Sequence, residues 1–70
     1  MRGSKDKAGR IFVSKLNIAL KEASETSYWL VVLHKANFLE EKLFNSLKED
    51  LDEIMRLLIA SIKMAKKNMA

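Results

Sequence analysis

Apolar residues recur in the first half of the chain at spacings that alternate between four and three positions. This heptad spacing places the side chains along one side of an α-helix. A second, offset set of apolar residues widens that surface beyond the seam of a two-stranded coiled coil. The main stripe, interrupted once by a polar residue, consists of Phe12, Leu16, Ala19, Ala23, Thr26, Leu30 and Leu33, and the offset set of Ile11, Ile18, Trp29 and Val32.

The second half of the chain carries a matching heptad stripe with its own apolar flank. A single partner helix cannot cover surfaces of this breadth, and they are typical of bundles of at least four helices. We therefore expect both halves to be helical and to pack against further helices. The stripe consists of Leu47, Leu51, Ile54, Leu58, Ser61 and Ala65, and its flank of Phe44, Met55, Ile59 and Ile62.

The heptad register breaks near the middle of the chain, where several residues favour the end of a helix. His34 and Lys35 are cations that suit a helix C-terminus. Asn37 tolerates the left-handed conformation in which helices commonly end. Alternatively, Asn37 and Glu40 form a capping box at the start of a second helix. Both interpretations place a short turn at about residues 35–40, and a short connection makes the two helices antiparallel neighbours.

We therefore predict an all-α fold, an antiparallel two-helix hairpin that forms one domain over residues 1–70. The expected elements are a helix over about residues 8–35, a turn over about 36–39 and a helix over about 40–67. A single core in a chain of this size supplies only ~3–5 kcal/mol, and no cysteine is present to form a disulfide. We expect the hairpin to complete a four-helix-type bundle, either by self-association or with a preceding N-terminal half.

Residue types that support catalysis or metal binding are sparse in this chain. It has no cysteine and a single histidine, His34, which disfavours a zinc site and a Ser–His–Asp triad. A di-iron bundle site needs a glutamate three positions before a histidine, and Val31 occupies that position. We predict no enzymatic activity, no cofactor and no metal. The mid-chain acidic residues, interpreted as a solvated face, are Glu22, Glu25, Glu49, Asp52 and Glu53.

Basic residues concentrate at the two ends of the chain, which an antiparallel hairpin brings together. This region, called the basic end below, holds eight basic residues and one acidic residue, a net charge of +7, while the remainder of the chain carries −3. Such a concentration of positive charge attracts polyanions, because each phosphate contact releases condensed counterions. The basic end comprises Arg2, Lys5, Lys7, Arg10, Lys15, Lys63, Lys66 and Lys67, with Asp6.

Two interpretations of the basic end remain open. In the first, the lysines and arginines keep the helix ends soluble, and those near the end of the second helix complement the helix dipole. In the second, the basic end binds RNA or another nucleic acid. The residues expected to make those contacts are Arg10, Lys15, Lys63, Lys66 and Lys67.

The breadth of the apolar surface predicts a homo-oligomer, and we also expect a protein partner. Tyr28 and Trp29 are adjacent and point about 100° apart on a helix, so one of them lies outside the seam between the two helices. We expect Trp29 to be an interface anchor, because exposed tryptophans commonly fill that role. The residues expected at the oligomer interface are Phe12, Leu16, Trp29, Leu30, Leu47, Leu51, Ile54, Leu58 and Ile62.

The sequence predicts a cytoplasmic protein that does not cross a membrane. The longest uncharged stretch, Thr26–Leu33, has eight residues, whereas a membrane-spanning helix needs about 20. The first ten residues show no signal-peptide pattern, and the lack of cysteine fits a reducing compartment.

Two segments of the chain resemble a known bacterial family. Phe12–Leu30 (FVSKLNIALKEASETSYWL) resembles the four-helix bundle proteins named after the intervening sequences of 23S ribosomal RNA genes, and Leu58–Asn68 (LIASIKMAKKN) is similar to that family's C-terminal helix. The resemblance implies ring-like homo-oligomers, pentamers in known relatives, and no catalytic activity. It also implies about two further helices before this region, with the chain corresponding to the C-terminal half. Some relatives, accessory proteins of diversity-generating retroelements, bind nucleic acid and a reverse transcriptase.

Overall fold

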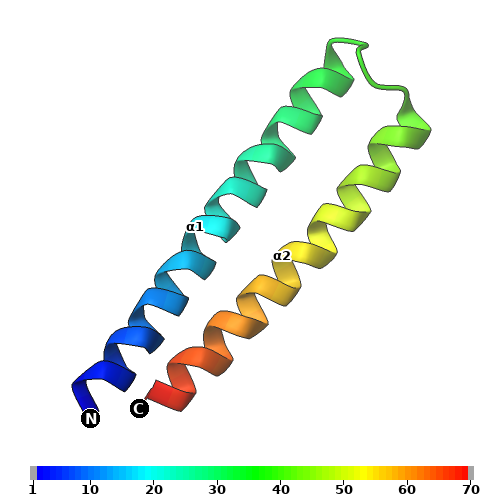
Figure 1. Cartoon of the computed structure of the whole chain (residues 1–70). Helices are drawn as coiled ribbons and strands as arrows, with labels where there is room; N and C mark the ends of the chain where they lie inside the picture. Colours follow the sequence, from blue (N-terminus) through cyan, green and yellow to red (C-terminus); the bar gives the residue numbers. More distant parts are fainter. Residues whose placement is uncertain (1, 70) are drawn as a thin grey trace.

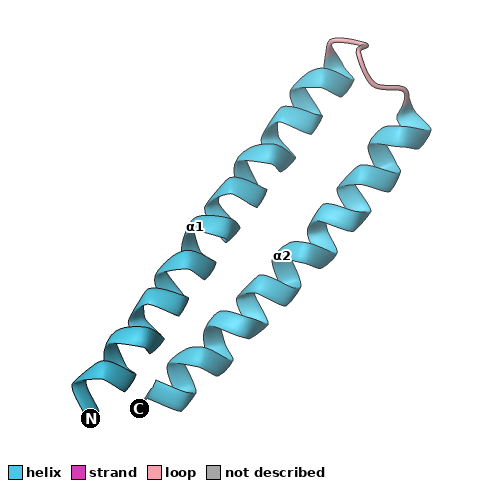
Figure 2. Cartoon of the chain, in the orientation of Figure 1, coloured by secondary structure: helices cyan, strands magenta, loops and turns pink. Residues whose placement is uncertain are grey.

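The computed structural model is an antiparallel hairpin of two long helices, and it describes residues 2–69, with the side chains of residues 7–68. Helix α1 spans Arg2–Lys35 and helix α2 spans Glu41–Met69 (Figure 1). The two ends of the chain lie together at one end of a rod with extents of 54 × 15 × 11 Å. Helices account for nearly all of the described residues (Figure 2). The predicted all-α antiparallel hairpin is therefore confirmed.

Helix α1 begins earlier than the sequence pattern predicted, at Arg2 instead of about residue 8. A glycine inside a helix costs about 1 kcal/mol relative to alanine, so Gly9 disfavours a helix that runs through it. In the structure Gly9 is half-buried on the side of α1 that faces α2. The chain contains no proline, so nothing prevents the helical hydrogen bonds from continuing through this position.

The end of α1 is a Schellman turn. The backbone N–H of Phe38 donates to the carbonyl of Leu33 at 2.9 Å, and that of Asn37 donates to the carbonyl of His34 at 3.1 Å. Asn37 has φ of 65°, which confirms the predicted left-handed helix end. The alternative capping box is wrong, because the carbonyl of Glu40 accepts the first bond of α2, from Phe44 at 2.9 Å, and Glu40 is itself the N-cap residue.

We predict that Asn37→Ala lowers the free energy of unfolding by about 1 kcal/mol, because the Cβ of alanine is crowded in the left-handed conformation. For a domain of this size the melting temperature should fall by about 4–8 °C. Thermal unfolding followed by circular dichroism measures the change. Asn45→Ala, at an exposed position inside α2, is the matched control and should not lower the melting temperature, because alanine is the better helix former. Equal losses in both variants would contradict this role for Asn37.

The two helices meet along one heptad column from each, called the seam below. Its few buried side chains, Val13, Ala23 and Ile62, retain 8–9% of their accessible surface. The other seam residues are half-buried, so the core of the hairpin is thin. The seam consists of Gly9, Val13, Leu16, Leu20, Ala23, Ser27, Leu30 and His34 from α1, and Phe44, Lys48, Leu51, Met55, Leu58, Ile62 and Ala65 from α2.

The seam coincides with only part of the apolar stripe that the sequence displays. Leu16, Ala23 and Leu30 lie in the seam, as half-buried or buried residues. The other four stripe positions of α1 are exposed along its edge. The apolar surface of α1 spans more than one heptad column, and the spacing alone does not tell which column meets α2. The exposed stripe residues are Phe12, Ala19, Thr26 and Leu33.

Two polar or aromatic contacts fix the register of the helices near the turn. The Nζ of Lys48 donates to the Oγ of Ser27 across the seam at 2.6 Å. The His34 ring stacks on the Phe44 ring, with centroids 4.2 Å apart and planes 12° from parallel. His34 is therefore a packing residue that joins the two helices.

Candidate functional site

One side of the hairpin carries a second apolar column on each helix, directly beside the seam. We call this surface the apolar face. On α2 its members repeat at alternating spacings of four and three over more than three heptads. The α2 column is Leu43, Leu47, Asp50, Ile54, Leu57, Ser61, Met64 and Asn68, and the α1 column is Phe12, Ala19, Thr26 and Leu33.

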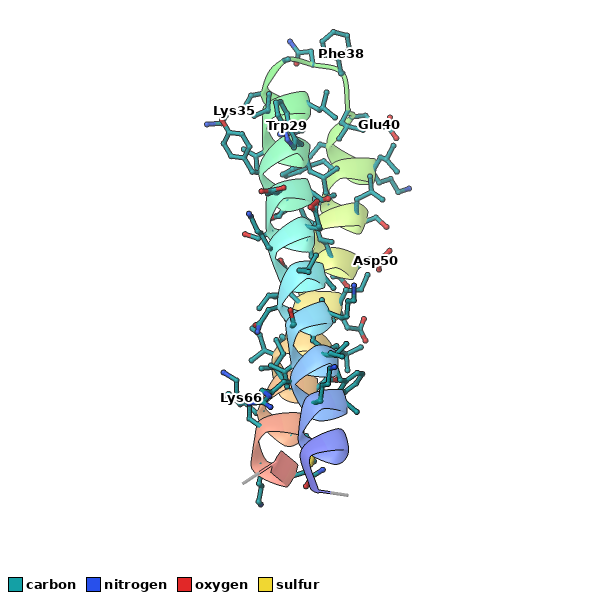
Figure 3. The ribbon with its side chains drawn as sticks, turned by 60° about the vertical axis from the view of Figure 1, so that its left-hand side comes forward. Trp29, Lys35, Phe38, Glu40, Asp50 and Lys66 are labelled. Carbon is teal, nitrogen blue, oxygen red and sulfur yellow. The ribbon has the colours of Figure 1, made fainter. Side chains whose placement is uncertain are left out.

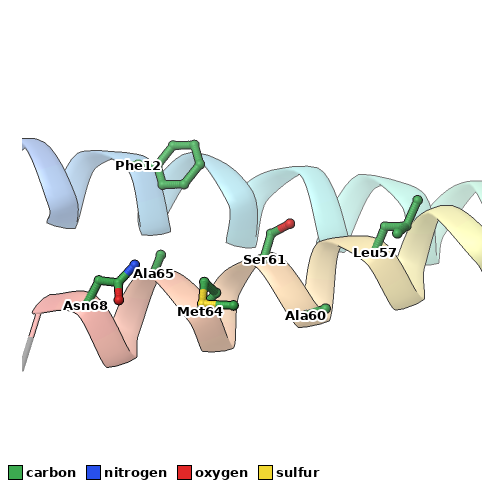
Figure 4. A pocket seen from close by; sticks show the side chains of 7 residues that line it. All are labelled: Phe12, Leu57, Ala60, Ser61, Met64, Ala65 and Asn68. Carbon is green, nitrogen blue, oxygen red and sulfur yellow. The ribbon is translucent and has the colours of Figure 1, made fainter.

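Two open grooves show that the α1 and α2 columns lie on the same side of the hairpin. In the groove near the open end, Phe12 of α1 lies across from six residues of α2 (Figure 4). In the groove nearer the turn, Thr26 and Leu30 of α1 lie beside α2. The α2 residues of the first groove are Leu57, Ala60, Ser61, Met64, Ala65 and Asn68, and those of the second are Leu47, Asp50, Leu51 and Ile54.

Large side chains on the apolar face are exposed to an extent unusual for apolar residues in a folded chain. Phe12, Leu57 and Met64 expose 55%, 62% and 61% of their surface, and Ile54 exposes 48%. Contiguous exposed apolar surface of this kind is uncommon on monomeric soluble proteins. The described part of the hairpin thus leaves more large apolar side chains exposed than buried.

Two polar residues on the apolar face, Thr26 and Asp50, differ in how strongly they would oppose its burial. The Thr26 hydroxyl donates to the carbonyl of Glu22 at 2.9 Å, so its donor is already satisfied within α1. Asp50 is exposed at the rim of the groove that Leu47 and Ile54 line. A carboxylate at this position needs a hydrogen-bond donor if the face becomes covered.

The outer side of α1 carries further exposed apolar residues. Tyr28 and Trp29 are both more than half exposed, and their rings form an edge-to-face pair with centroids 5.6 Å apart. Figure 3 shows Trp29 on α1 near the turn, below Phe38 at the tip. Both aromatics lie outside the seam, whereas their adjacent positions predicted this for one of them. Ile11 and Ile18 are also half exposed.

The structure separates the residues expected at an oligomer interface into two groups. Phe12, Trp29, Leu47 and Ile54 are exposed and remain available to a partner. The other five residues are buried or half-buried in the seam between α1 and α2. Sequence reasoning missed three exposed members of the apolar face, Leu43, Leu57 and Met64, although their heptad spacing from Leu47 and Ile54 was readable. The seam residues among the expected set are Leu16, Leu30, Leu51, Leu58 and Ile62.

The antiparallel fold brings the two halves of the basic end together, as expected. Phe12 lies across from Ala65, which places Arg10 level with Lys66 and Lys67 at the open end (Figure 3 labels Lys66). Asp50 and Glu40 lie progressively nearer the turn. The side chains of Arg2, Lys5 and Asp6 lie outside those that the structure describes. The described members of the basic end, all exposed, are Lys7, Arg10, Lys15, Lys63, Lys66 and Lys67.

The side of α2 away from the apolar face is more polar. Asp52, Ile59 and Lys66 recur on this side at intervals of seven positions. We call this the polar face. Within the described residues, no three histidine, cysteine or acidic side chains lie close enough together to hold a metal ion. Neither of the described helices has a stretch long and apolar enough to cross a membrane.

Fold and surface define a helical-hairpin protein with an uncovered apolar face. The family model for the 23S rRNA-intervening sequence protein matches residues 1–60. The chain belongs to this family, as the resemblance of Phe12–Leu30 predicted; the second resembling segment, Leu58–Asn68, lies mostly beyond the matched residues. Neither the curated proteins nor the solved structures gave a match.

Proposed function

We propose that this protein is a non-enzymatic interaction module that self-associates through its apolar face and presents its remaining surfaces to another protein. The observation that supports this function is the exposed apolar column on α2, continued by Phe12 on α1. The described seam has only three buried side chains, none of them completely, which is a small core for two helices of this length. Small domains of this kind commonly gain stability by oligomerisation.

The native mass of the chain tests this function. We expect light scattering at micromolar concentration to give at least twice the chain mass of 8.0 kDa, and the average mass should fall on dilution. Helical content should fall with it, because part of the stability comes from association. A folded particle of 8.0 kDa across the dilution series would contradict the proposed function.

The basic end favours a second candidate function, that of an RNA-binding accessory protein. Six exposed basic side chains lie at one end of the hairpin with no acidic side chain described among them. This concentration of charge is the electrostatic footprint expected of a nucleic-acid surface. Members of this end also lie beside the polar face, so binding there leaves the apolar face free for self-association.

We predict that replacing Lys63, Lys66 and Lys67 by glutamine weakens RNA binding by at least tenfold at low salt. The plot of log K against log salt should become less steep, its negative slope shrinking in magnitude by about 2. Each lost phosphate contact removes ~0.7 from this magnitude for a single strand and ~0.9 for a duplex. Fluorescence anisotropy over several salt concentrations measures both quantities.

In the matched control, glutamine replaces three exposed lysines outside the basic end, Lys21, Lys35 and Lys42. The control therefore has the same net charge as the basic-end variant. This control should bind more tightly than the basic-end variant. Equal binding by the two variants would show that net charge alone matters and would contradict a site at the basic end.

A further inference from the structure

We propose that nucleic acid binds the side of the hairpin that carries the polar face, and that the bound segment is double-stranded. This inference rests on the second candidate function and specifies its site and its class of ligand. It excludes Lys15, a member of the basic end, and includes Arg56, which lies outside that end. The proposed contacts, called the basic strip below, are Lys7 and Arg10 of α1 and Arg56, Lys63 and Lys66 of α2.

The cations of α1 divide between two sides of the hairpin. Phe12 lies on the apolar face, across from α2. Arg10 is two positions and Lys7 five positions from Phe12, so their side chains point about 160° and 140° away from it. Lys15 is three positions from Phe12 and points within about 60° of it. Arg10 and Lys7 therefore lie on the side of the polar face, whereas Lys15 lies on the side of the apolar face.

The cations of α2 divide in the same way. Met64 lines the groove on the apolar face, and Lys66 follows it by two positions, so Lys66 points about 160° away. Lys63 lies within about 60° of Lys66 around the helix, and Arg56, seven positions earlier, within about 20° of Lys63. Lys67 points within about 60° of Met64 and lies outside the strip. Both helices thus contribute exposed cations to one side of the hairpin.

No acidic residue interrupts the positive charge around the strip. Residues 7–21 and residues 54–68 contain none, and Phe12 across from Ala65 places these two segments side by side. Glu53, three positions before Arg56, is the nearest acidic residue on α2 and ends an acidic segment that extends toward the turn. The charge therefore limits the strip to the half of the hairpin between the open end and Arg56.

The layout of the strip favours a duplex over a single strand. Arg56 and Lys66 lie about 15 Å apart along α2, and the same length of a DNA duplex carries about nine phosphates. Packed helices lie about 8–10 Å apart, so the strip presents two straight rows of cations to the two phosphate backbones. A single-strand surface also needs aromatic side chains on which bases stack. The only aromatic residue in residues 7–21 and 54–68 is Phe12, on the opposite side.

Fluorescence anisotropy with labelled duplex RNA, duplex DNA and their separated strands tests the class of ligand. We expect at least one duplex to bind at least ~5-fold more tightly than its own strands at the same low salt concentration, because both rows of cations then contact phosphates. Comparing the two duplexes identifies which nucleic acid is preferred.

Two single substitutions test the side of the hairpin. Arg56→Gln and Lys15→Gln each remove one positive charge from an exposed position, so both variants have the same net charge. We expect Arg56→Gln to weaken duplex binding by at least ~3-fold at low salt and Lys15→Gln to change it little, because only Arg56 contacts a phosphate. Circular dichroism should show equal helical content in both variants.

Each outcome bears on the proposal. Tighter duplex binding that Arg56→Gln alone weakens supports it. Tighter binding of the single strands overturns the class of ligand, and a loss in Lys15→Gln as large as that in Arg56→Gln overturns the side; both results leave nucleic-acid binding standing. An unaltered chain that binds none of the four probes at low salt overturns both this inference and the second candidate function.

Discussion

Replacing Leu58 by aspartate is expected to abolish the cooperative unfolding transition of the hairpin. Leu58 is half-buried in the seam, between the buried Ile62 and the seam residue Met55. Moving a carboxylate from water into an apolar seam costs several kcal/mol unless a partner is present. A core of this size supplies only ~3–5 kcal/mol, so the loss is comparable to the whole stability. Leu16→Asp on α1 should have the same effect.

Circular dichroism at 222 nm during heating measures this result. Ile59→Asp is the matched control, since Ile59 neighbours Leu58 but lies 41% exposed on the polar face. The control should keep a cooperative transition close to that of the unaltered chain. A cooperative transition retained by Leu58→Asp would show that the seam is assigned to the wrong column.

Ile54→Asp is expected to weaken self-association by at least ~100-fold, or about 3 kcal/mol. Ile54 lies in the middle of the α2 column of the apolar face, so the substitution places a new carboxylate at the centre of the surface proposed for self-association. This carboxylate lies near Asp50 in the same groove, and burial of unpaired like charges is strongly unfavourable. Sedimentation equilibrium measures the dissociation constant.

Ile59→Asp again provides the control. Ile54 and Ile59 expose similar fractions of their surface, 48% and 41%, and are five positions apart, which places them about 140° from each other around α2. The two variants therefore have the same composition and net charge but alter opposite sides of the helix. If both weakened association equally, the apolar face would not be the site of self-association.

Local sequence signals were sufficient to predict the hairpin. The absence of proline and the heptad spacing predict two long helices, and Asn37 predicts where the first one ends. Each of these features acts through the backbone of its own segment, so no tertiary information is needed. The first residue of α1 was harder to predict from the sequence. Gly9 lowers helix propensity, but the helix accommodates it beside α2.

The division between seam and exposed face could not be predicted from spacing. Phe12 and Val13 are neighbours, and both belong to heptad columns that contain Leu16. The structure places Val13 in the seam and Phe12 on the apolar face. When adjacent columns are both apolar, periodicity gives the orientation of a helix only to within about 100°, and packing between the two helices decides the rest. For the same reason Leu57 and Met64 were overlooked as candidate interface residues.

The contact between His34 and Phe44 was also beyond prediction from the sequence. The two rings are ten positions apart, and they stack because the Schellman turn reverses the chain between them. From its position in the sequence, His34 was predicted only to be a cation near a helix end. Stacking across the turn depends on the relative rotation of α1 and α2, which local signals do not contain.

Hydroxyl-radical footprinting of the unaltered chain tests most directly whether self-association covers the apolar face. Oxidation of Met64 and Phe12, measured by mass spectrometry at concentrations above and below dissociation, reports the exposure of that face. We predict at least several-fold protection of both residues at high concentration, while Tyr28 on the outer side of α1 stays reactive. Protection of Tyr28 and Trp29, with Met64 and Phe12 unchanged, would contradict the account and move the interface to the outer side of α1.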